Sequence, residues 1–211
     1  MRTFDIERED LMQVLRDRGI SDERILKAMS RVERHMFVPE PFTSRSYEDS
    51  ALPIGKGQTI SQPYTVAFMT QALGVREGDR VLEVGTGSGY QAAILAELGA
   101  RVFSIERNLD LLASARRVLD LLRYRVATKG GDGTIGWNDF APYNGIIVTA
   151  GAPDVPKPLL DQLADGGRLV IPVGDLDQQN LLLCTRRGTT FEQREVVGFK
   201  FVPLIGKMGW R

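Results

Sequence analysis

The chain has 211 residues, which is enough for one α/β domain with a sizeable hydrophobic core. Its 27 lysine and arginine residues balance its 27 aspartate and glutamate residues, so no basic excess points to nucleic acid as a partner. The only cysteine, Cys184, lies in an apolar run and can form neither an internal disulfide nor a zinc site, so we expect a small buried side chain.

The first ten residues are rich in charge and lack the apolar core of a signal peptide. No apolar run in the chain approaches the ~20 residues that are needed to span a bilayer. We therefore expect a cytoplasmic protein without a membrane partner.

The first third of the chain is predicted to be mainly helical. Apolar residues recur at helical spacing over residues 5–18 and 22–34, and Ser21 is placed to cap the second of these helices. Residues 43–61 are expected to form a loop. A further helix is predicted from Pro63 to Leu73, because proline favours a first helical turn and a glycine follows the last one.

From residue 76 onward, short apolar strands alternate with helices. The predicted strands cover residues 80–85, 101–106, 124–128, 145–149 and 168–173. The predicted helices cover residues 89–98, 109–122 (capped by Asn108) and 156–164. Such alternation is typical of the α/β class with a doubly wound, mostly parallel sheet, as in Rossmann-like folds.

The last part of the chain changes character. Residues 180–187 and 190–202 alternate between apolar and polar side chains on either side of Gly188 and Thr189. This pattern predicts a C-terminal antiparallel hairpin that closes the sheet.

A glycine-rich loop follows the first predicted strand of the alternating part. Residues 83–90 read Glu-Val-Gly-Thr-Gly-Ser-Gly-Tyr and lead directly into a helix. A strand–loop–helix unit of this kind holds a nucleotide-like ligand at the helix N-terminus, although a turn after a buried strand would also explain it. A dinucleotide loop has its third glycine at the sixth position, where this chain has Tyr90, so a pyrophosphate ligand and a nicotinamide oxidoreductase are disfavoured. The spacing resembles motif I of class I S-adenosylmethionine methyltransferases.

An acidic residue ends the second strand of this unit. Glu106 comes 21 positions after Gly85, close to the ~20 at which an acid reaches a ribose hydroxyl. As a carboxylate it can accept hydrogen bonds from both ribose hydroxyls. The alternative is an ion pair with Arg101 or Arg107.

A second acid, Asp132, lies between Gly131 and Gly133 just past the third strand. This is the carboxyl edge of the sheet, where such folds bind ligands, and Asp132 could accept a hydrogen bond from an adenine amine. The alternative is an ordinary Gly-Asp-Gly turn.

The segment before the helix at Pro63 also suggests a site. Ser61 lies where a helix N-cap belongs, and capping alone would explain it. The same geometry can hold a carboxylate, because a helix N-terminus presents free amides and a positive dipole. The residues alone leave both explanations open.

Residues 51–63, Ala-Leu-Pro-Ile-Gly-Lys-Gly-Gln-Thr-Ile-Ser-Gln-Pro, resemble the signature of protein-L-isoaspartate O-methyltransferases. Further matching segments follow the family's order, at residues 37–39, 83–90, 131–133, 146–149, 166–167 and 201–204. The resemblance covers roughly residues 10–205. Residues 51–63 discriminate most, because glycine loops of this type occur in many other methyltransferases.

The resemblance implies transfer of a methyl group from S-adenosylmethionine to the α-carboxyl of isoaspartyl residues in damaged proteins, which initiates repair. S-adenosylhomocysteine is the implied product, and no metal is expected. Ser61 is the implied active-site serine, with Thr59, Val202, Pro203 and Leu204 bordering the isoaspartyl group. The donor is expected to be bound by Glu83, Gly85, Thr86, Gly87, Ser88, Gly89, Glu106, Asp132 and Gly133. Expected partners are isoaspartyl-containing proteins and peptides, and not nucleic acid.

The implied chemistry makes few demands on the chain. A carboxylate acceptor is ionised at pH 7 and needs no strong base, which agrees with a sequence whose single histidine, His35, is expected at a helix end. No Gly-x-Ser-x-Gly elbow surrounds Ser61, so we expect its hydroxyl to donate to the reacting carboxylate. Residues 199–204 are expected to pair with a substrate peptide as an added strand.

Two other functions remain open, and two features depart from the family. The first function is methyl transfer to a small molecule or to another protein carboxylate. The second is a degenerate binding or scaffold protein, whose sign would be loss of Ser61 or Glu106. The departures are Asn144, where the family commonly has aspartate, and residues 206–211, which match nothing assignable. We expect a single domain over residues 1–211, with 1–75 as a substrate-side extension and 76–211 as the cofactor-binding core and C-terminal strands.

Overall fold

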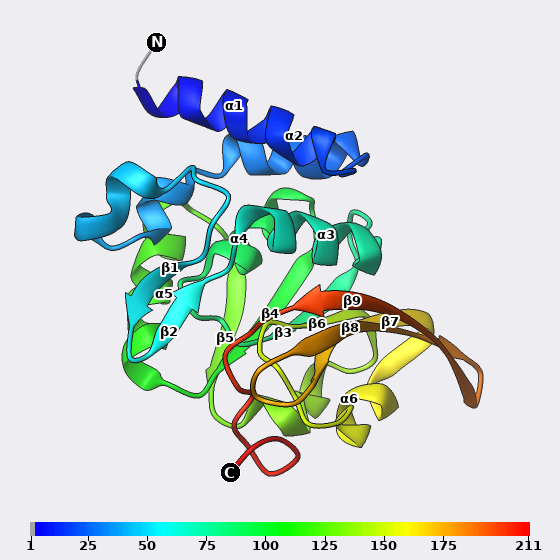
Figure 1. Cartoon of the computed structure of the whole chain (residues 1–211). Helices are drawn as coiled ribbons and strands as arrows, with labels where there is room; N and C mark the ends of the chain where they lie inside the picture. Colours follow the sequence, from blue (N-terminus) through cyan, green and yellow to red (C-terminus); the bar gives the residue numbers. More distant parts are fainter. Residues whose placement is uncertain (1–2) are drawn as a thin grey trace.

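The computed structural model describes residues 3–211, apart from the side chains of Thr3 and Val197; Met1 and Arg2 of the charged N-terminal segment lie outside it. Within that range, one central sheet has seven strands in the order β5-β4-β3-β6-β7-β8-β9 (Figure 1). The strands are β3 (Arg80–Val84), β4 (Arg101–Glu106), β5 (Val126–Gly130), β6 (Tyr143–Val148), β7 (Leu163–Gly174), β8 (Gln179–Arg187) and β9 (Thr190–Phe199). Neighbours from β5 to β7 are parallel, and β8 and β9 are antiparallel to the strands beside them.

The predicted alternation of strands and helices is confirmed. The helices of this part are α4 (Tyr90–Glu97), α5 (Leu109–Leu121) and α6 (Lys157–Asp161). Asn108 caps α5 as expected, accepting from the backbone N–H groups of Asp110 and Leu111. The third strand begins at Val126 instead of residue 124, because a turn with Arg123 in the left-handed region (φ 61°) still belongs to the end of α5.

The strand predicted over 168–173 is longer in the structure and begins at Leu163. Leu163 already pairs with Tyr143 of β6, and the register then shifts before Arg168 pairs with Gly145. Helix α6 is therefore shorter than predicted and ends at Asp161. The C-terminal hairpin is confirmed, although β9 ends at Phe199 and the chain beyond it leaves the sheet.

The first third of the chain contains helices and one small hairpin. Its elements are α1 (Thr3–Asp17), α2 (Glu23–Arg31), the 3-10 turns η1 (Arg34–Phe37) and η2 (Glu40–Arg45), β1 (Leu52–Gly55), β2 (Gln58–Ile60) and α3 (Pro63–Leu73). The expected loop over 43–61 is wrong, because β1 and β2 pair as an antiparallel hairpin. Its turn uses positive φ angles at Lys56 and Gly57, and such short strands leave too little alternation to recognise.

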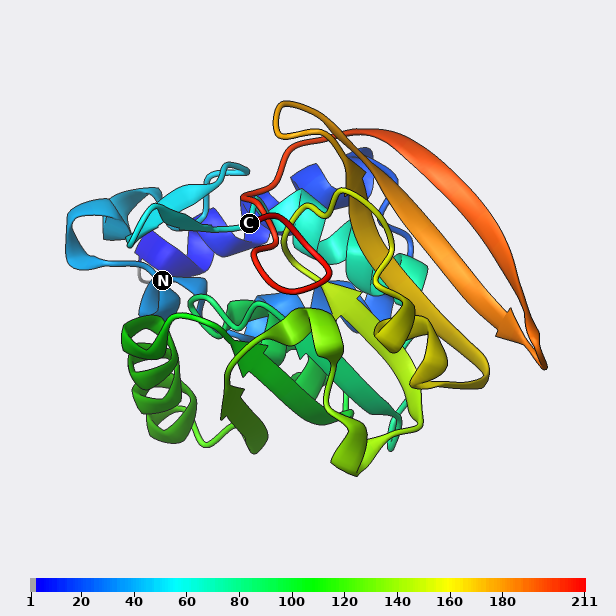
Figure 2. The ribbon, with the colours of Figure 1, turned by 90° about the horizontal axis from the view of Figure 1, so that it is seen from below.

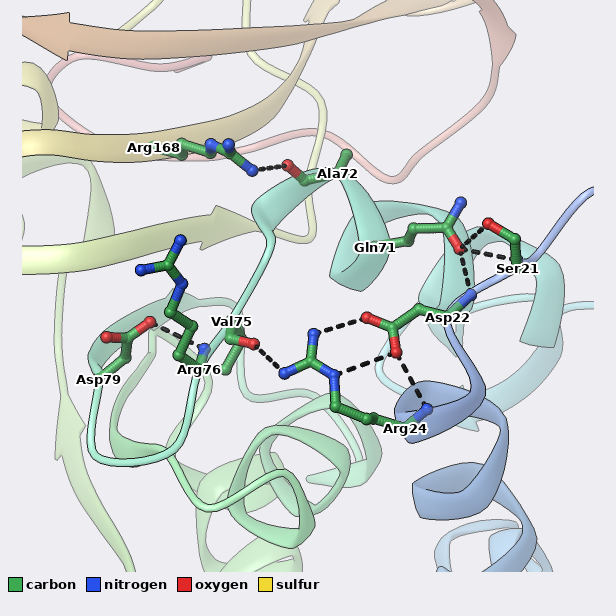
Figure 3. Close-up of polar contacts among 9 residues, drawn as sticks. All are labelled: Ser21, Asp22, Arg24, Gln71, Ala72, Val75, Arg76, Asp79 and Arg168. Atoms are coloured by element: carbon green, nitrogen blue, oxygen red, sulfur yellow. Dashed lines mark hydrogen bonds and ion pairs between the residues drawn. The ribbon is translucent and has the colours of Figure 1, made fainter.

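The predicted cap of α2 is also wrong by one residue. Asp22 is the N-cap, and its side chain accepts from the backbone N–H of Arg24 at 2.9 Å. The backbone N–H groups of Ser21 and Asp22 both donate to Gln71 Oε1 on α3, at 2.9 and 3.0 Å (Figure 3). The start of α2 is therefore capped locally by Asp22, and the residues just before it are held by a distant side chain.

Further contacts attach the N-terminal helices to the rest of the fold. Arg24 Nη1 donates to the Val75 carbonyl at 3.1 Å, next to the end of α3 (Figure 3). Leu15 of α1, Leu26 of α2 and Ile94 of α4 are fully or almost fully buried in one hydrophobic cluster. Because this cluster joins the two parts of the chain, we propose that residues 1–75 and 76–211 fold as one domain. No helix within residues 3–211 combines the length and the apolar character that crossing a bilayer requires.

Candidate active site

A cavity of about 400 Å³ opens at the carboxyl ends of the parallel strands. This is where open α/β sheets bind ligands, and the volume is in the range of small-molecule sites. Its walls come from the β1–β2 hairpin and the start of α3, the glycine loop, the end of β4 and the chain after β9. Figure 2 shows the chain after β9, in red, returning across the molecule beside the parallel strands.

The glycine loop forms the strand–loop–helix unit expected from the sequence. Gly85 has a φ of 99°, which side chains rarely adopt, and a Cβ there would overlap Thr149 Oγ1. Thr149 donates to the Gly85 carbonyl at 2.8 Å and lies at the end of β6. The loop ends at Gly89, the residue before α4. Glycine at position 85 therefore lets two strand ends approach each other beside the cavity.

Tyr90, at the sixth loop position, is buried against the N-terminal part of the chain. Its ring lies 5.6 Å from that of Phe37, edge to face, and the Arg34 guanidinium lies 5.1 Å from its centroid. Arg34 is itself buried and donates to the carbonyls of Ser46 and Ser50. The tyrosine therefore does not crowd the strand beneath it, and it joins the glycine loop to the extension.

Glu106 is buried at the end of β4 and lines the cavity. Its carboxylate accepts from the backbone N–H of Gly87 at 2.9 Å and from that of Asn108 at 2.8 Å. The alternative of an ion pair with Arg101 or Arg107 is wrong, since no such pair is found within the described residues. A carboxylate can accept about four hydrogen bonds, so the two from backbone N–H groups leave room for further donors.

Glu83 is fully buried and lines the same cavity. Its Oε2 accepts from Ser104 Oγ, which lies 2.6 Å from Thr86 Oγ1. Its Oε1 has no hydrogen-bond partner among residues 3–211. Burial raises the pKa of this carboxyl group to about 8, although the bond from Ser104 acts in the opposite direction. Oε1 of Glu83 therefore lacks a hydrogen-bond donor or a cation beside it within the described part of the chain.

The β1–β2 hairpin covers the glycine loop from the other side. A Cβ at position 87 would lie 3.6 Å from Ile54 Cδ1, and Lys56 Nζ at the hairpin turn forms an ion pair with Asp110 Oδ2 of α5 at 2.7 Å. Thr59 and Ser61, at the end of this hairpin, both line the cavity.

Ser61 does not cap α3. The N-cap is Gln62, whose side chain makes no capping bond and instead donates to the Asp49 carbonyl at 2.9 Å. Asp49 Oδ1 accepts from the backbone N–H of Tyr64 and so replaces a local cap at the start of α3. Within residues 3–211 the Ser61 hydroxyl has no hydrogen-bond partner, and Ser61 lines the cavity.

The chain after β9 forms the last wall of the cavity, through Val202, Pro203 and Leu204. Gly151 donates to the Val202 carbonyl at 2.8 Å and accepts from the Leu204 N–H at 2.7 Å. One edge of this segment is therefore already paired. On the opposite edge Pro203 offers a carbonyl but no N–H, so a peptide strand added there could only donate to position 203.

Comparisons with known proteins identify this arrangement. The family model described as protein-L-isoaspartate(D-aspartate) O-methyltransferase matches residues 6–209. The chain belongs to this family. It is 55% identical to the protein-L-isoaspartate O-methyltransferase of Salinibacter ruber, covering 97% of this chain and 94% of the relative. It is 50% identical to that of Dictyoglomus thermophilum, covering 99% and 95%.

Two solved structures carry the same family name. A protein-L-isoaspartate O-methyltransferase superimposes with a TM-score of 0.87 at 31% identity, over 96% of this chain and 67% of that one. A putative member from Plasmodium falciparum, in complex with S-adenosyl-L-homocysteine, superimposes with a TM-score of 0.81 at 25% identity, over 93% and 97%. The expected fold and family are confirmed.

Two expected donor-binding residues do not line the cavity. Gly133 lines it, but Asp132 is not among the lining residues. The Asp132 carboxylate accepts from the N–H and Oγ1 of Thr134, at 2.9 and 2.7 Å, and from the Lys207 N–H at 2.8 Å. Burial acts to raise its pKa, but these hydrogen bonds outweigh burial and lower it. Gly89 also lies outside the lining, at the back of the loop against α5.

The two departures from the family pattern have structural explanations. Asn144 Oδ1 accepts from the backbone N–H of Arg80 at 2.9 Å, so the amide supplies the acceptor that an aspartate would offer. Residues 206–211 fold back against the turn at Asp132 and Thr134 and against Gly151. Within them, Met208 N–H donates to Thr134 Oγ1 at 3.1 Å and Trp210 Nε1 to the Gly151 carbonyl at 3.0 Å.

Several cavity residues were missed by the sequence analysis. They are Lys56, Gln58, Ile60, Val66, Met69, Val84, Tyr90, Gln91, Ile105, Arg107, Asn108, Thr149, Ala150 and Ile205. Ser104 was also missed, and its polar side chain in an otherwise apolar strand was the available signal. The remaining candidates are structural. His35 Nδ1 lies 2.8 Å from the Tyr47 hydroxyl, and burial raises the pKa of the Cys184 thiol to about 11. No cluster of three or more His, Cys, Asp or Glu within the described residues could hold a metal ion.

Proposed function

We infer that the chain is an S-adenosylmethionine-dependent methyltransferase that acts on the α-carboxyl of isoaspartyl residues in damaged proteins and so initiates their repair. The observation that carries this inference is that Ser61 and residues 202–204 share one cavity with the glycine loop. Relatives at 50–55% identity over nearly the whole chain have the same named activity.

The cavity has features that suit the methyl donor. The buried Glu83 Oε1 has no partner among residues 3–211, and an amino-acid ammonium group is the kind of donor that would satisfy it. Glycines at 85, 87 and 133 leave backbone beside the cavity uncovered by side chains. We propose that residues 85–89 hold the methionine part of the donor, that Glu106 accepts from its ribose hydroxyls, and that Gly133 borders its adenine.

Asp132 is proposed to act at the adenine site as well. Its carboxylate is engaged by Thr134 and Lys207, so it shapes the turn that presents Gly133. A direct bond from Asp132 to an adenine amine stays a prediction.

The bound donor would supply a sulfonium methyl group. A lone pair on an isoaspartyl carboxylate oxygen would form the new O–CH3 bond, and the electron pair of the broken S–CH3 bond would stay on sulfur. The isoaspartyl carboxyl group is ionised at pH 7, because its ordinary pKa is about 4, so no residue must remove a proton from it. The task of the chain is to orient the carboxylate. We propose that the Ser61 hydroxyl donates to one carboxylate oxygen and sets the angle of the other.

The surroundings of Ser61 are partly apolar, although Thr59 and Pro203 are exposed, and we propose that a bound peptide would complete the exclusion of water. Ile60 is buried, and Val202, Pro203 and Leu204 add an apolar wall. Since a cation and an anion become two neutral groups during transfer, weak solvation favours the reaction; this is our hypothesis for the site.

Thr59 and residues 202–204 are proposed to border the isoaspartyl group. Because isoaspartyl residues arise in many sequence contexts, recognition should rest mainly on backbone contacts, and many isoaspartyl-containing proteins would be substrates. A cytoplasmic location and the absence of a nucleic-acid partner stay predictions.

A pair of peptides tests the function. They share one sequence and differ only in carrying isoaspartate or aspartate, and S-adenosylmethionine labelled on its methyl group is the donor. We expect base-labile label on the isoaspartyl peptide and almost none on the aspartyl peptide. Equal labelling of both would contradict the inference and favour a general carboxyl methyltransferase, and labelling of neither would favour a different acceptor.

A further inference from the structure

Four aromatic side chains form a continuous row whose two ends are close in the sequence to residues that line the cavity, although none of the four lines it. The ring centroids of Tyr64 and Phe68 lie 5.9 Å apart, those of Phe68 and Phe199 lie 5.7 Å apart, and those of Phe199 and Phe201 lie 6.4 Å apart. All four side chains are half-buried, so each keeps part of its surface accessible. Two belong to α3. Phe199 is the last residue of β9, which lies beside α3, and Phe201 follows two residues later in the chain after β9 (Figure 1).

Each end of the row is close in the sequence to a wall of the proposed isoaspartyl site. Tyr64 lies three residues after Ser61, and Phe201 directly precedes Val202; Ser61 and Val202 both line the cavity. Neither end of the row is loose. The Arg18 guanidinium lies 3.6 Å from the Tyr64 ring centroid, and the Phe201 N–H donates to Gln179 Oε1 at 2.7 Å. The aromatic surface is therefore held in place and continues outward from the proposed site of the isoaspartyl group.

Core packing accounts for only part of this row. Phe68, Phe199 and Phe201 pack at the border of one hydrophobic cluster and are not among its buried members. Aromatic rings that are fixed in this way lose little side-chain entropy on binding and offer flat apolar area. The segment after β9 already uses one edge on Gly151. On the opposite edge Pro203 has no N–H and the Phe201 N–H donates to Gln179, so a peptide that continues past Phe201 would be held there mainly by the aromatic rings.

We propose that the row formed by Tyr64, Phe68, Phe199 and Phe201 is an extended substrate subsite. It takes an apolar or aromatic side chain that lies a few residues from the isoaspartyl residue in the same peptide. This inference rests on the methyl transfer proposed above. It adds a preference to a reaction that accepts many sequences, because a flanking side chain raises the rate without being required.

A peptide scan with the unaltered protein is the first test. Isoaspartyl heptapeptides of glycine and serine carry one phenylalanine, moved through the three positions on each side of the isoaspartate. We expect at least one position to raise kcat/KM roughly two- to tenfold over the peptide without phenylalanine, as one aromatic contact would. A flat scan would overturn the subsite, whereas methylation of the glycine–serine peptide would still support the proposed function.

Two variants locate the effect. Phe199→Ala removes the ring that links Phe68 to Phe201 and so interrupts the row. Phe191→Ala removes another half-buried ring from the same strand, but this ring packs against a different hydrophobic cluster. We expect the gain from the peptide phenylalanine to disappear in Phe199→Ala and to persist in Phe191→Ala. A gain that persists in both would overturn the assignment to this row. If Phe199→Ala fails to fold, Phe68→Leu replaces it and should reduce the same gain.

Discussion

Replacing Glu83 by glutamine should flatten the pH dependence of folding stability. This carboxyl group is fully buried, and its pKa rises from the ordinary value of 4.5 to about 8, chiefly through burial. In the unfolded chain the group ionises near 4.5, whereas in the folded protein it keeps its proton until about pH 8. A raised pKa means that the stabilising contribution is complete below the unfolded pKa and is lost as the pH rises through the folded pKa.

The size of the effect follows from that interval. Each pH unit between the two pKa values is worth about 1.4 kcal/mol, so the contribution lost between pH 4.5 and 8 is of the order of 5 kcal/mol. Glutamine has nearly the same shape and carries no titratable proton. The variant should therefore resemble the parent protein near pH 5 and be more stable than it near pH 8, by several kcal/mol, in the absence of the methyl donor.

Urea unfolding at pH 5, 6, 7 and 8 without donor measures this difference. Glu192→Gln, an exposed carboxylate on β9, is the matched control and should leave the pH dependence close to that of the parent. Parallel stability curves for the parent protein and Glu83→Gln would refute the reasoning, because they would mean that Glu83 is ionised in the fold across this range.

Three further outcomes are expected. Ser61→Ala should lower turnover while leaving donor affinity within a few-fold, as seen by methyl-transfer kinetics and calorimetry, and unchanged turnover would discard the role of the hydroxyl. Gly85→Ala should lose roughly 2–4 kcal/mol of stability by chemical unfolding, because it combines a strained φ of 99° with overlap on Thr149 Oγ1. Gly188→Ala, also at positive φ but in open space, is its control and should lose less. Trp210→Phe removes the bond to the Gly151 carbonyl and should cost about 1 kcal/mol of stability, and no measurable loss would show that residues 206–211 are held by other contacts.

Much of the fold follows from local signals. The strand–loop–helix around Gly85 needs only an apolar run, glycines at fixed spacing and a following helix, and all of these lie within about twenty residues. The Asn108 cap and the hairpin about Gly188 are equally local, and both are confirmed. The elements that were wrong include short local ones, such as the β1–β2 hairpin, whose strands are too brief to show alternation. The segment before α2 also has a distant partner, because Gln71 accepts from the backbone N–H groups of Ser21 and Asp22.

The candidate site divides in the same way. The sequence indicated the glycine loop, Glu106 and Ser61, because the residue types and their spacing carry the chemistry. Only the tertiary structure decided that Ser104 holds Glu83 and that residues 206–211 engage Asp132. Periodicity and spacing report on neighbours along the chain, whereas these contacts join segments 21 and 75 residues apart. Such distances are closed by the packing of the whole sheet, and no local pattern records them.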